Sequence, residues 1–427
     1  MSNNVFDELK WRGLVYDSTE GTSNLLATEK VSIYNGFDPT SDSLHVGHLV
    51  PMVSLARLQR YGHHPIALAG GGTGMIGDPS GRSTERNLLS PEVLRHNVEC
   101  VKGQLGSILD FEVKSNPARI VNNYDWLSQI SMIDYLRDVG KHFTINYMLS
   151  KDSVKGRIGR ESGLSYTEFS YMLLQAIDFL HLHDNLGVMM QTGGSDQWGN
   201  ITAGTQLIRK VRQKPAQALV YPLITRADGT KFGKTAEGES VWLDPKKTSP
   251  YRFYQFFINT EDSKVLDLMR FYTFLTQEEV AEYEVAVAEN PHRREAQRRL
   301  AQETTRMVHG DTALAKAEQA TAVLFGGSLD GLDSADIADI FAEVPSSSIA
   351  KSALEGDGVG IVDLLANTTL ATSKGDARRS IKGGSINLNN VRLTDGGKGI
   401  TLNDAIEGQF IVLRKGKKKY HLVKVTQ

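Results

Sequence analysis

The sequence predicts an α/β fold over its first half, an all-α segment after it and a small α+β module at its end. Up to about residue 248, short apolar runs alternate with segments of helical periodicity. This alternation is typical of a parallel sheet covered by helices on both faces. Beyond it the strand patterns stop, and from about residue 359 a helix pattern is followed by short strands. A chain of 427 residues is also too long for one hydrophobic core.

Each strand pattern of the first half leads into a helix pattern or a polar loop. Strand patterns open the segments 30–37, 64–78, 118–123 and 187–200, and helix patterns fill 46–62, 91–106 and 167–183. The helix at 91–106 has Pro91 in its first turn and Ser90 as its expected N-cap. Parallel sheets bind ligands outside the carboxyl ends of their strands. Because the glycine-rich and polar stretches all follow strands, they should converge at that edge.

The second half predicts helices and then a small module. A helix is expected at 288–310, with Asn290 as its cap, Pro291 at its start and Gly310 at its end. Residues 341–360 are rich in serine and glycine and are expected to be a linker. A helix near 362–368 and short strands should follow.

Composition indicates a soluble globular protein, with 40% hydrophobic and 23% charged residues. No apolar run reaches the roughly 18 residues of a membrane-spanning helix, so no membrane contact is expected. The N-terminus lacks the basic and apolar regions of a signal peptide. The single cysteine, Cys100, excludes an intrachain disulfide and a cysteine-based metal cluster. We therefore expect a reducing, cytoplasmic location.

Charge divides the chain into an acidic body and a basic tail. Residues 351–427 carry 13 Lys and Arg against 7 Asp and Glu, whereas the whole chain carries 48 against 50. A basic tail favours an anionic partner such as nucleic acid. Alternatively, the run "RKGKKK" at 414–419 is only a solvated turn between two strands. Charge alone does not separate the two interpretations.

Two histidines, His45 and His48, lie three residues apart at the expected junction of a strand and a helix. A metal site would need further Cys, His or Glu ligands, which the surrounding sequence does not supply. Core packing is also disfavoured, because the neighbouring residues are those of turns and helix entries. A helix N-terminus offers backbone N–H groups to a phosphate, and Gly47 allows a close approach. We therefore favour phosphate contact.

A second candidate motif, "DGTKFGKTAEG" at 228–238, places Lys231 and Lys234 on either side of a glycine, with Thr235 next to them. It does not have the spacing of a Walker A loop. It is a cationic loop that carries a hydroxyl group and could serve phosphate binding. Taken alone, the motif favours an ordinary basic surface loop over a phosphate site.

Taken together, the two motifs resemble those of the class I aminoacyl-tRNA synthetases. HVGH (45–48) matches the HIGH motif of that family and KFGKT (231–235) matches its KMSKS motif, in the expected order. The closest resemblance is to the bacterial tyrosyl enzymes, and it extends over nearly the whole chain. It is supported by the stretches "YNGFDPTSDSLHVGHL" (34–49), "GGTGMIGDPSGR" (71–82), "YMLLQAIDF" (171–179) and "GGSDQWGN" (193–200). The segment 373–390 is similar to an RNA-binding fold shared with a small-subunit ribosomal protein.

The resemblance implies four segments. They are a Rossmann-like catalytic domain at 1–228, a mobile loop and connection at 229–247, a helical anticodon-binding domain at 248–345 and a C-terminal RNA-binding domain at 356–427. It also implies a tyrosine–tRNA ligase, which forms tyrosyl-adenylate and pyrophosphate from L-tyrosine and ATP. The tyrosyl group then passes to the 3′ end of tRNA(Tyr). Mg²⁺ should accompany ATP through its phosphates, with no metal held by the protein.

By resemblance, the phenol hydroxyl of tyrosine meets Tyr34 and Asp178, and its α-amino group meets Asp78, Tyr171 and Gln175. The spacing agrees, because Tyr171, Gln175 and Asp178 share one helical face. That face could instead point to solvent, but the helix is largely apolar, and buried polar groups on it would require partners.

The resemblance also implies the residues that act on ATP. The expected catalytic residues are Thr40, His45, His48, Lys231, Lys234 and Thr235. The expected ATP-binding residues are Asp38, Gly47, Asp196, Gln197 and Lys234. Asp196 follows a strand and should meet the ribose, although an Asp-capped turn is an alternative. One position departs from the family: Asn35 stands where relatives often have Cys or Ala, and we assign it no role.

RNA contacts are expected from Arg209 and Lys210 at the acceptor stem, and from the helical segment and the tail. The candidates there are Arg293, Arg294, Arg298, Arg299, Arg378, Arg379, Lys417 and Lys418. The resemblance further implies a homodimer with contacts around 130–165. Tryptophanyl-tRNA synthetase, a non-catalytic RNA-binding relative of the synthetases and a small nucleotidyltransferase are the alternatives.

Overall fold

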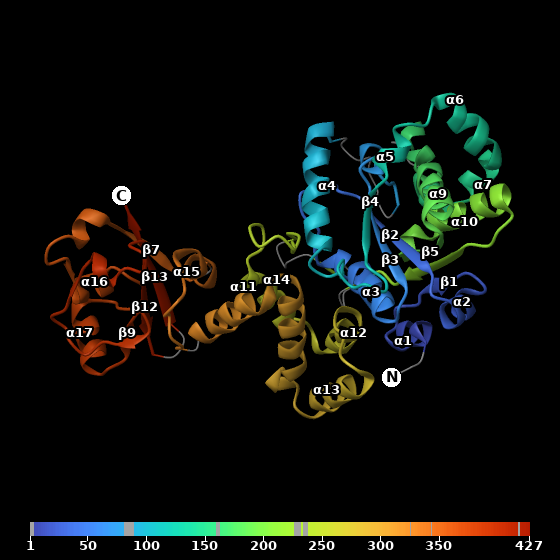
Figure 1. Cartoon of the computed structure of the whole chain (residues 1–427). Helices are drawn as coiled ribbons and strands as arrows, with labels where there is room; N and C mark the ends of the chain where they lie inside the picture. The colour runs from blue at the N-terminus through green and yellow to red at the C-terminus, as the bar shows by residue number, and fades with distance from the viewer. Residues whose placement is uncertain are drawn as a thin grey trace. The chain divides into compact units, whose positions relative to one another are not determined.

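The computed structural model describes residues 4–80, 89–158, 163–225, 232–233, 238–324, 326–342, 344–416 and 419–427. The chain forms two compact units (Figure 1). The first comprises residues 1–248 and 256–308, and the second comprises 249–255 and 309–427. The segment at 248–345, which we predicted as one helical domain, is thus shared between the two units.

A six-stranded sheet forms the centre of the first unit, in the order β1-β6-β5-β2-β3-β4. The strands are β1 (Asp17–Ser18), β2 (Ser32–Phe37), β3 (His64–Ala69), β4 (Arg119–Asn122), β5 (Val188–Gly194) and β6 (Gln217–Tyr221). All neighbours pair in parallel except the short edge strand β1, which is antiparallel to β6. The predicted parallel sheet is therefore confirmed, with β1 and β6 as strands that we did not predict.

Helices cover both faces of this sheet (Figure 1). Parallel crossovers are right-handed as a rule, which puts α3 (Leu49–Arg60) and α4 (Pro91–Leu105) on one face and α10 (Trp198–Arg212) on the other. Helix α9 (Tyr166–Leu186) packs against α10 and β5. The predicted Ser90 cap is confirmed, since its hydroxyl accepts from Val93 N. The chain runs outward from β2 through β3 to β4 and returns to place β5 on the other side of β2. This reversal creates a crevice at the carboxyl ends of β2 and β5.

Shorter helices complete the first unit. They are α1 (Val5–Trp11), α2 (Thr22–Thr28), α5 (Tyr124–Leu127), α6 (Met132–Asp134), α7 (Ile145–Leu149), α8 (Asp152–Ile158), α12 (Asp262–Tyr272) and α13 (Gln277–Glu289). Two further helices, α11 (Pro250–Ile258) and α14 (Glu295–Val323), run from one unit into the other. No described helix is long and apolar enough to cross a membrane.

The predicted start of a helix at Asn290 is wrong. Asn290 is the C-cap of α13, and Pro291 opens a single 3₁₀ turn that ends at Arg294, whose φ of 51° is left-handed. Because a left-handed residue cannot continue a right-handed helix, α14 begins only at Glu295. The helix was expected to end at Gly310, but α14 continues to Val323, and Gly310 only interrupts it with φ 83° and ψ 172°.

A five-stranded sheet forms the second unit, in the order β10-β9-β12-β13-β7. Its strands are β7 (Ser346–Ala350), β9 (Ile386–Leu388), β10 (Val391–Arg392), β12 (Phe410–Lys415) and β13 (Lys419–Thr426), and β8 (Val359–Gly360) pairs separately with β11 (Gly399–Ile400). Helices α15 (Ser334–Ile340), α16 (Ile361–Ala366) and α17 (Lys374–Lys382) accompany them. The expected linker at 341–360 is therefore wrong in part. Its serine-rich centre is β7, an edge strand paired in parallel with β13, and such a strand needs little apolar patterning because most of it stays exposed.

Candidate active site

Polar side chains from three strand ends meet around the crevice between β2 and β5. Asp38 and Thr40 follow β2, a glycine-rich turn leading to Asp78 follows β3, and Asp196 and Gln197 lie in the 3₁₀ turn after β5. Thr40 is exposed and Asp196 is half-buried. The predicted convergence at the carboxyl edge is thus present.

HVGH forms a 3₁₀ turn (Val46–His48) that leads directly into α3. His45 Nδ1 accepts from Gly47 N at 3.1 Å, and His48 Nδ1 accepts from His45 N at 3.1 Å. Because both Nδ1 atoms are acceptors, each neutral ring carries its proton on Nε2 and can donate there. A Cβ on Gly47 would lie 2.8 Å from the His45 ring, which explains the glycine between the histidines. The turn therefore holds two imidazole donors with their centroids 4.0 Å apart.

The described part of KFGKT lies against the same turn. A Cβ on Gly233 would lie 3.3 Å from Val46 Cγ2 and 3.6 Å from Gly47 N, and its φ of 108° favours glycine. Gly233 O accepts from Val241 N, and Val241 O accepts from Val46 N, both at 3.0 Å. Two motifs that are far apart in the chain are thereby joined. Lys231, Lys234 and Thr235 lie outside the described residues.

Tyr34 of β2 and Asp178 of α9 are a pair of neighbouring, buried polar residues. Tyr34 and Asp178 are 1% and 2% exposed. Asp178 accepts from Asn123 Nδ2 at 2.9 Å and from Trp126 Nε1 at 2.8 Å. The hydroxyl of Tyr34 has no hydrogen-bond partner among the described residues. A buried hydroxyl without a partner is costly, so this arrangement suits a ligand that brings a polar group to Tyr34 and Asp178.

Hydrogen bonds connect Asp178 to the residues at the strand ends. Tyr171 OH donates to Asp38 at 2.7 Å, Thr73 Oγ1 donates to the same carboxylate at 2.8 Å, and Asn123 Nδ2 lies 2.9 Å from both Thr73 Oγ1 and Asp178. We did not predict Thr73, Asn123 or Trp126. Asn123 could have been found, because it is the last residue of the segment 118–123 that was predicted as a strand.

Asp78 belongs to a second group of hydrogen-bonded residues. Its carboxylate accepts from Gln197 Nε2 at 2.6 Å, from Ser80 N at 2.9 Å and from Asn200 Nδ2 at 3.5 Å. Gln175 lies half-buried on α9, the helix that carries Tyr171 and Asp178. No group of three or more His, Cys, Asp or Glu suited to a metal occurs in the described part of the chain.

Asp178 should make the stability of the protein depend on pH. Burial raises the pKa of Asp178 to about 8. The unfolded chain releases this proton near pH 4, whereas the folded protein holds it to about pH 8, so stability declines as pH rises through that window. In calorimetry, the unfolding temperature of Asp178→Asn relative to wild type should therefore increase from pH 5 to pH 8.

The matched control is Asp184→Asn on the same helix. Arg212 lowers the pKa of Asp184, so its contribution to stability is lost only in acid and the difference from wild type should be constant from pH 5 to pH 8. A constant difference for Asp178→Asn as well would contradict the prediction.

The predicted RNA contacts differ in their surroundings. Arg209 and Lys210 end α10, and Arg378 and Arg379 are exposed on α17. The run at 414–419 spans the hairpin between β12 and β13, with Lys417 and Lys418 outside the described residues.

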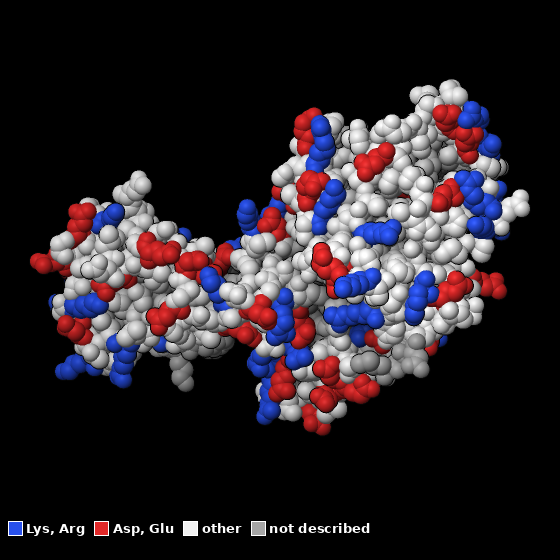
Figure 2. All heavy atoms as spheres, in the orientation of Figure 1, with Lys and Arg blue, Asp and Glu red and all other residues white. Residues whose placement is uncertain are grey.

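The arginines of the helical segment stand among acidic residues (Figure 2). Arg293 lies near Glu295, and Arg299 lies near Glu279 and Glu303. Arg294 donates to the carbonyl groups of Ile258 and Thr260, a structural role at the end of α11. Arg298 is exposed.

Comparison with known proteins defines the family. A model of the class I tRNA synthetases for tryptophan and tyrosine matches residues 26–326, and a model of the SYY-like tyrosine–tRNA ligase C-terminal domain matches residues 336–423. A tyrosine–tRNA ligase of Roseiflexus castenholzii is 57% identical over 422 residues, which are 99% of each chain. One from Opitutus terrae is 51% identical over 99% of this chain and 100% of its own. This chain belongs to the tyrosyl class I aminoacyl-tRNA synthetases.

A solved structure agrees with this membership. The C-terminally truncated mitochondrial tyrosyl-tRNA synthetase of Aspergillus nidulans superposes with a TM-score of 0.70 at 30% identity, over 76% of this chain and 95% of its own. The predicted fold class and the predicted activity, ligation of tyrosine to tRNA with ATP, are confirmed by the family. The tryptophanyl and non-catalytic alternatives have no support among these full-length relatives.

Proposed function

We propose that this ligase activates tyrosine in the crevice between β2 and β5. The observation that carries the proposal is the meeting of HVGH with Phe232–Gly233 of KFGKT, together with the buried Tyr34 hydroxyl that has no partner among the described residues. We place the pocket for tyrosine at Tyr34 and Asp178. The first motif supplies donors for phosphate, the second belongs to a cationic loop, and the pocket suits a phenol. No protein nucleophile is required, because the carboxylate of tyrosine attacks the α-phosphate of ATP itself.

The pocket residues then have separate roles. Tyr34 and Asp178 bind the phenol hydroxyl, and Asp78, Tyr171 and Gln175 bind the α-amino group. The carboxylates of Asp38 and Asp78 support this second role, since they add negative charge near Tyr171. A positively charged ammonium group is favoured in such surroundings.

ATP occupies the open side of the crevice in this proposal. His45 and His48 donate to its phosphates from the start of α3, with Thr40 and the close approach allowed by Gly47. Asp38, Asp196 and Gln197 lie toward the ribose, and Lys231, Lys234 and Thr235 add positive charge. Mg²⁺ binds mainly through the phosphates. Catalysis follows from positioning and from stabilisation of charge on the phosphates.

The remaining assignments concern tRNA binding and the dimer interface. tRNA contacts are assigned to Arg209, Lys210, Arg378, Arg379, Lys417 and Lys418. We further propose a cytoplasmic homodimer with contacts around 130–165. The exposed apolar side chains of Met132 (75%), Ile133 (67%) and Ile145 (60%) support this interface.

ATP–pyrophosphate exchange with tyrosine, phenylalanine and tryptophan tests the proposed site. We expect exchange with tyrosine alone. Tryptophan-dependent exchange would overturn the roles of Tyr34 and Asp178. No exchange from a folded protein that still binds tRNA would contradict the proposed catalytic site.

A further inference from the structure

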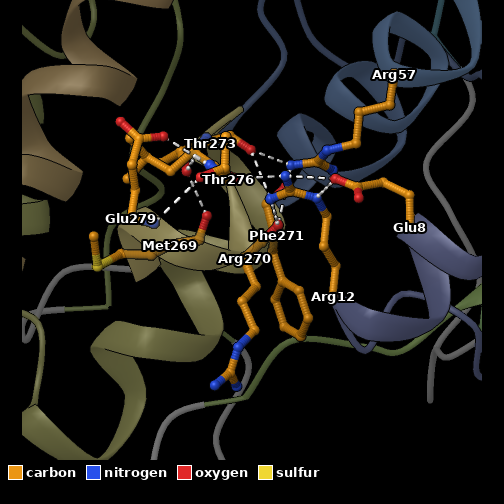
Figure 3. Close-up of polar contacts among 10 residues, drawn as sticks. Glu8, Arg12, Arg57, Met269, Arg270, Phe271, Thr273, Thr276 and Glu279 are labelled. Carbon is orange, nitrogen blue, oxygen red and sulfur yellow. Dashed lines mark hydrogen bonds and ion pairs between the residues drawn. The ribbon is translucent and has the colours of Figure 1, made fainter. Parts of the chain in front are cut away.

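The end of α12 is held by two buried arginines from elsewhere in the first unit (Figure 3). Arg12, the C-cap of α1, donates to the carbonyl groups of Arg270, Thr273 and Leu275 at 2.7–3.1 Å. Arg57 of α3 donates to those of Arg270, Phe271 and Thr273 at 2.5–3.0 Å. Cations at the carboxyl end of a helix interact favourably with its dipole. The last turn of α12 is therefore a fixed point of the first unit.

The last residue of α12, Tyr272, contacts HVGH. Tyr272 is fully buried, and its hydroxyl donates to Val46 O at 3.0 Å. The same carbonyl accepts the N–H of Leu49, which closes the 3₁₀ turn. Helix α3 is thus attached to α12 at both ends: through Val46 just before its start and through Arg57 in its last turn. Two separated attachments fix the orientation of a helix, and with it the turn that carries the histidines.

The ring of Tyr272 also meets the second motif. Its centroid lies 6.1 Å from that of Phe232 and 5.7 Å from that of Phe257, which packs against Phe232 as well. Tyr272 therefore contacts the backbone of HVGH with its hydroxyl and the phenylalanine of KFGKT with its ring.

We propose that Tyr272 is a positioning residue for tyrosine activation, which holds the HVGH turn on the anchored end of α12 and seats Phe232 beside it. The proposal rests on the function proposed above and adds a residue that touches neither substrate. If the histidines of HVGH are displaced, they stabilise the transition state less well. Binding of tyrosine is affected less, because other residues hold the tyrosine.

The test compares Tyr272→Phe with Tyr420→Phe. Tyr420 OH donates to Val323 O at 2.8 Å in the second unit, so the control removes the same type of buried bond from the unit that does not contain HVGH. The kinetics of ATP–pyrophosphate exchange are measured per active site, and the number of active sites is taken from the burst of tyrosyl-adenylate formation. For Tyr272→Phe we expect kcat to fall about threefold to tenfold with KM for tyrosine unchanged, and for Tyr420→Phe no change.

Amide hydrogen exchange at residues 46–49 provides a readout that does not need activity. It should be faster in Tyr272→Phe than in wild type and unaltered in Tyr420→Phe. Wild-type kcat together with wild-type amide exchange in Tyr272→Phe would overturn the inference, as would an equal loss of kcat in both variants. If the wild type shows no tyrosine-dependent ATP–pyrophosphate exchange, the proposed function is contradicted. Amide hydrogen exchange at 46–49 would then be the only test of the positioning role.

Discussion

Replacing Asp178 with asparagine should lower kcat/KM for tyrosine in ATP–pyrophosphate exchange by about 10³-fold. The carboxyl oxygens of Asp178 accept from both Asn123 and Trp126, and the group is proposed to meet the substrate hydroxyl as well. An asparagine offers one oxygen, and its amide group would face a second donor inside a dry pocket. The substrate hydroxyl would then lose its partner.

The same variant should lose most of the preference for tyrosine over phenylalanine. Sites that pair a substrate hydroxyl reject the analogue without it by about 10⁴-fold or more, and tyrosyl-tRNA synthetases are themselves the standard example of this effect. Asp184→Asn, on the same helix but outside the pocket, should keep wild-type kinetics. Unchanged discrimination in Asp178→Asn would show that Asp178 does not recognise the phenol.

The parallel sheet and its crevice could be predicted because each depends on local pattern. Strands β2, β3, β4 and β5 are short apolar runs, and the polar residues after them had to meet at one edge. Tyr171, Gln175 and Asp178 were named by resemblance to the family, and their helical spacing agreed with one shared face. These predictions needed no knowledge of contacts between distant segments.

The features that sequence reasoning missed depend on such distant contacts. Arg12 and Arg57 donate to backbone carbonyl groups more than two hundred positions further along the chain. Every residue has a carbonyl group, so the sequence does not show which of them accept these bonds. Likewise, a serine-rich strand such as β7 is recognisable only once β13 pairs with it.

Replacing His45 with asparagine should lower kcat for exchange by about 10²-fold while KM for tyrosine stays near its wild-type value. His45 has two roles that this substitution separates. Its Nδ1 caps the HVGH turn by accepting from Gly47 N, and its Nε2 is the proposed donor to phosphate. Asparagine is a favoured N-cap residue and can replace the first role, but it is too short to donate from the position of Nε2.

The complementary change, His45→Gln, extends a donor toward the position of Nε2 and loses the favoured cap. If phosphate contact is the main role of His45, glutamine should retain more activity than asparagine at equal counts of active sites, although its unfolding temperature is lower. If capping is the main role, asparagine should be the more active of the two. The order of activity of the two variants therefore distinguishes a histidine that stabilises the transition state from one that only shapes the turn. Glutamine is the poorer cap, so a higher activity of His45→Gln cannot come from the capping bond.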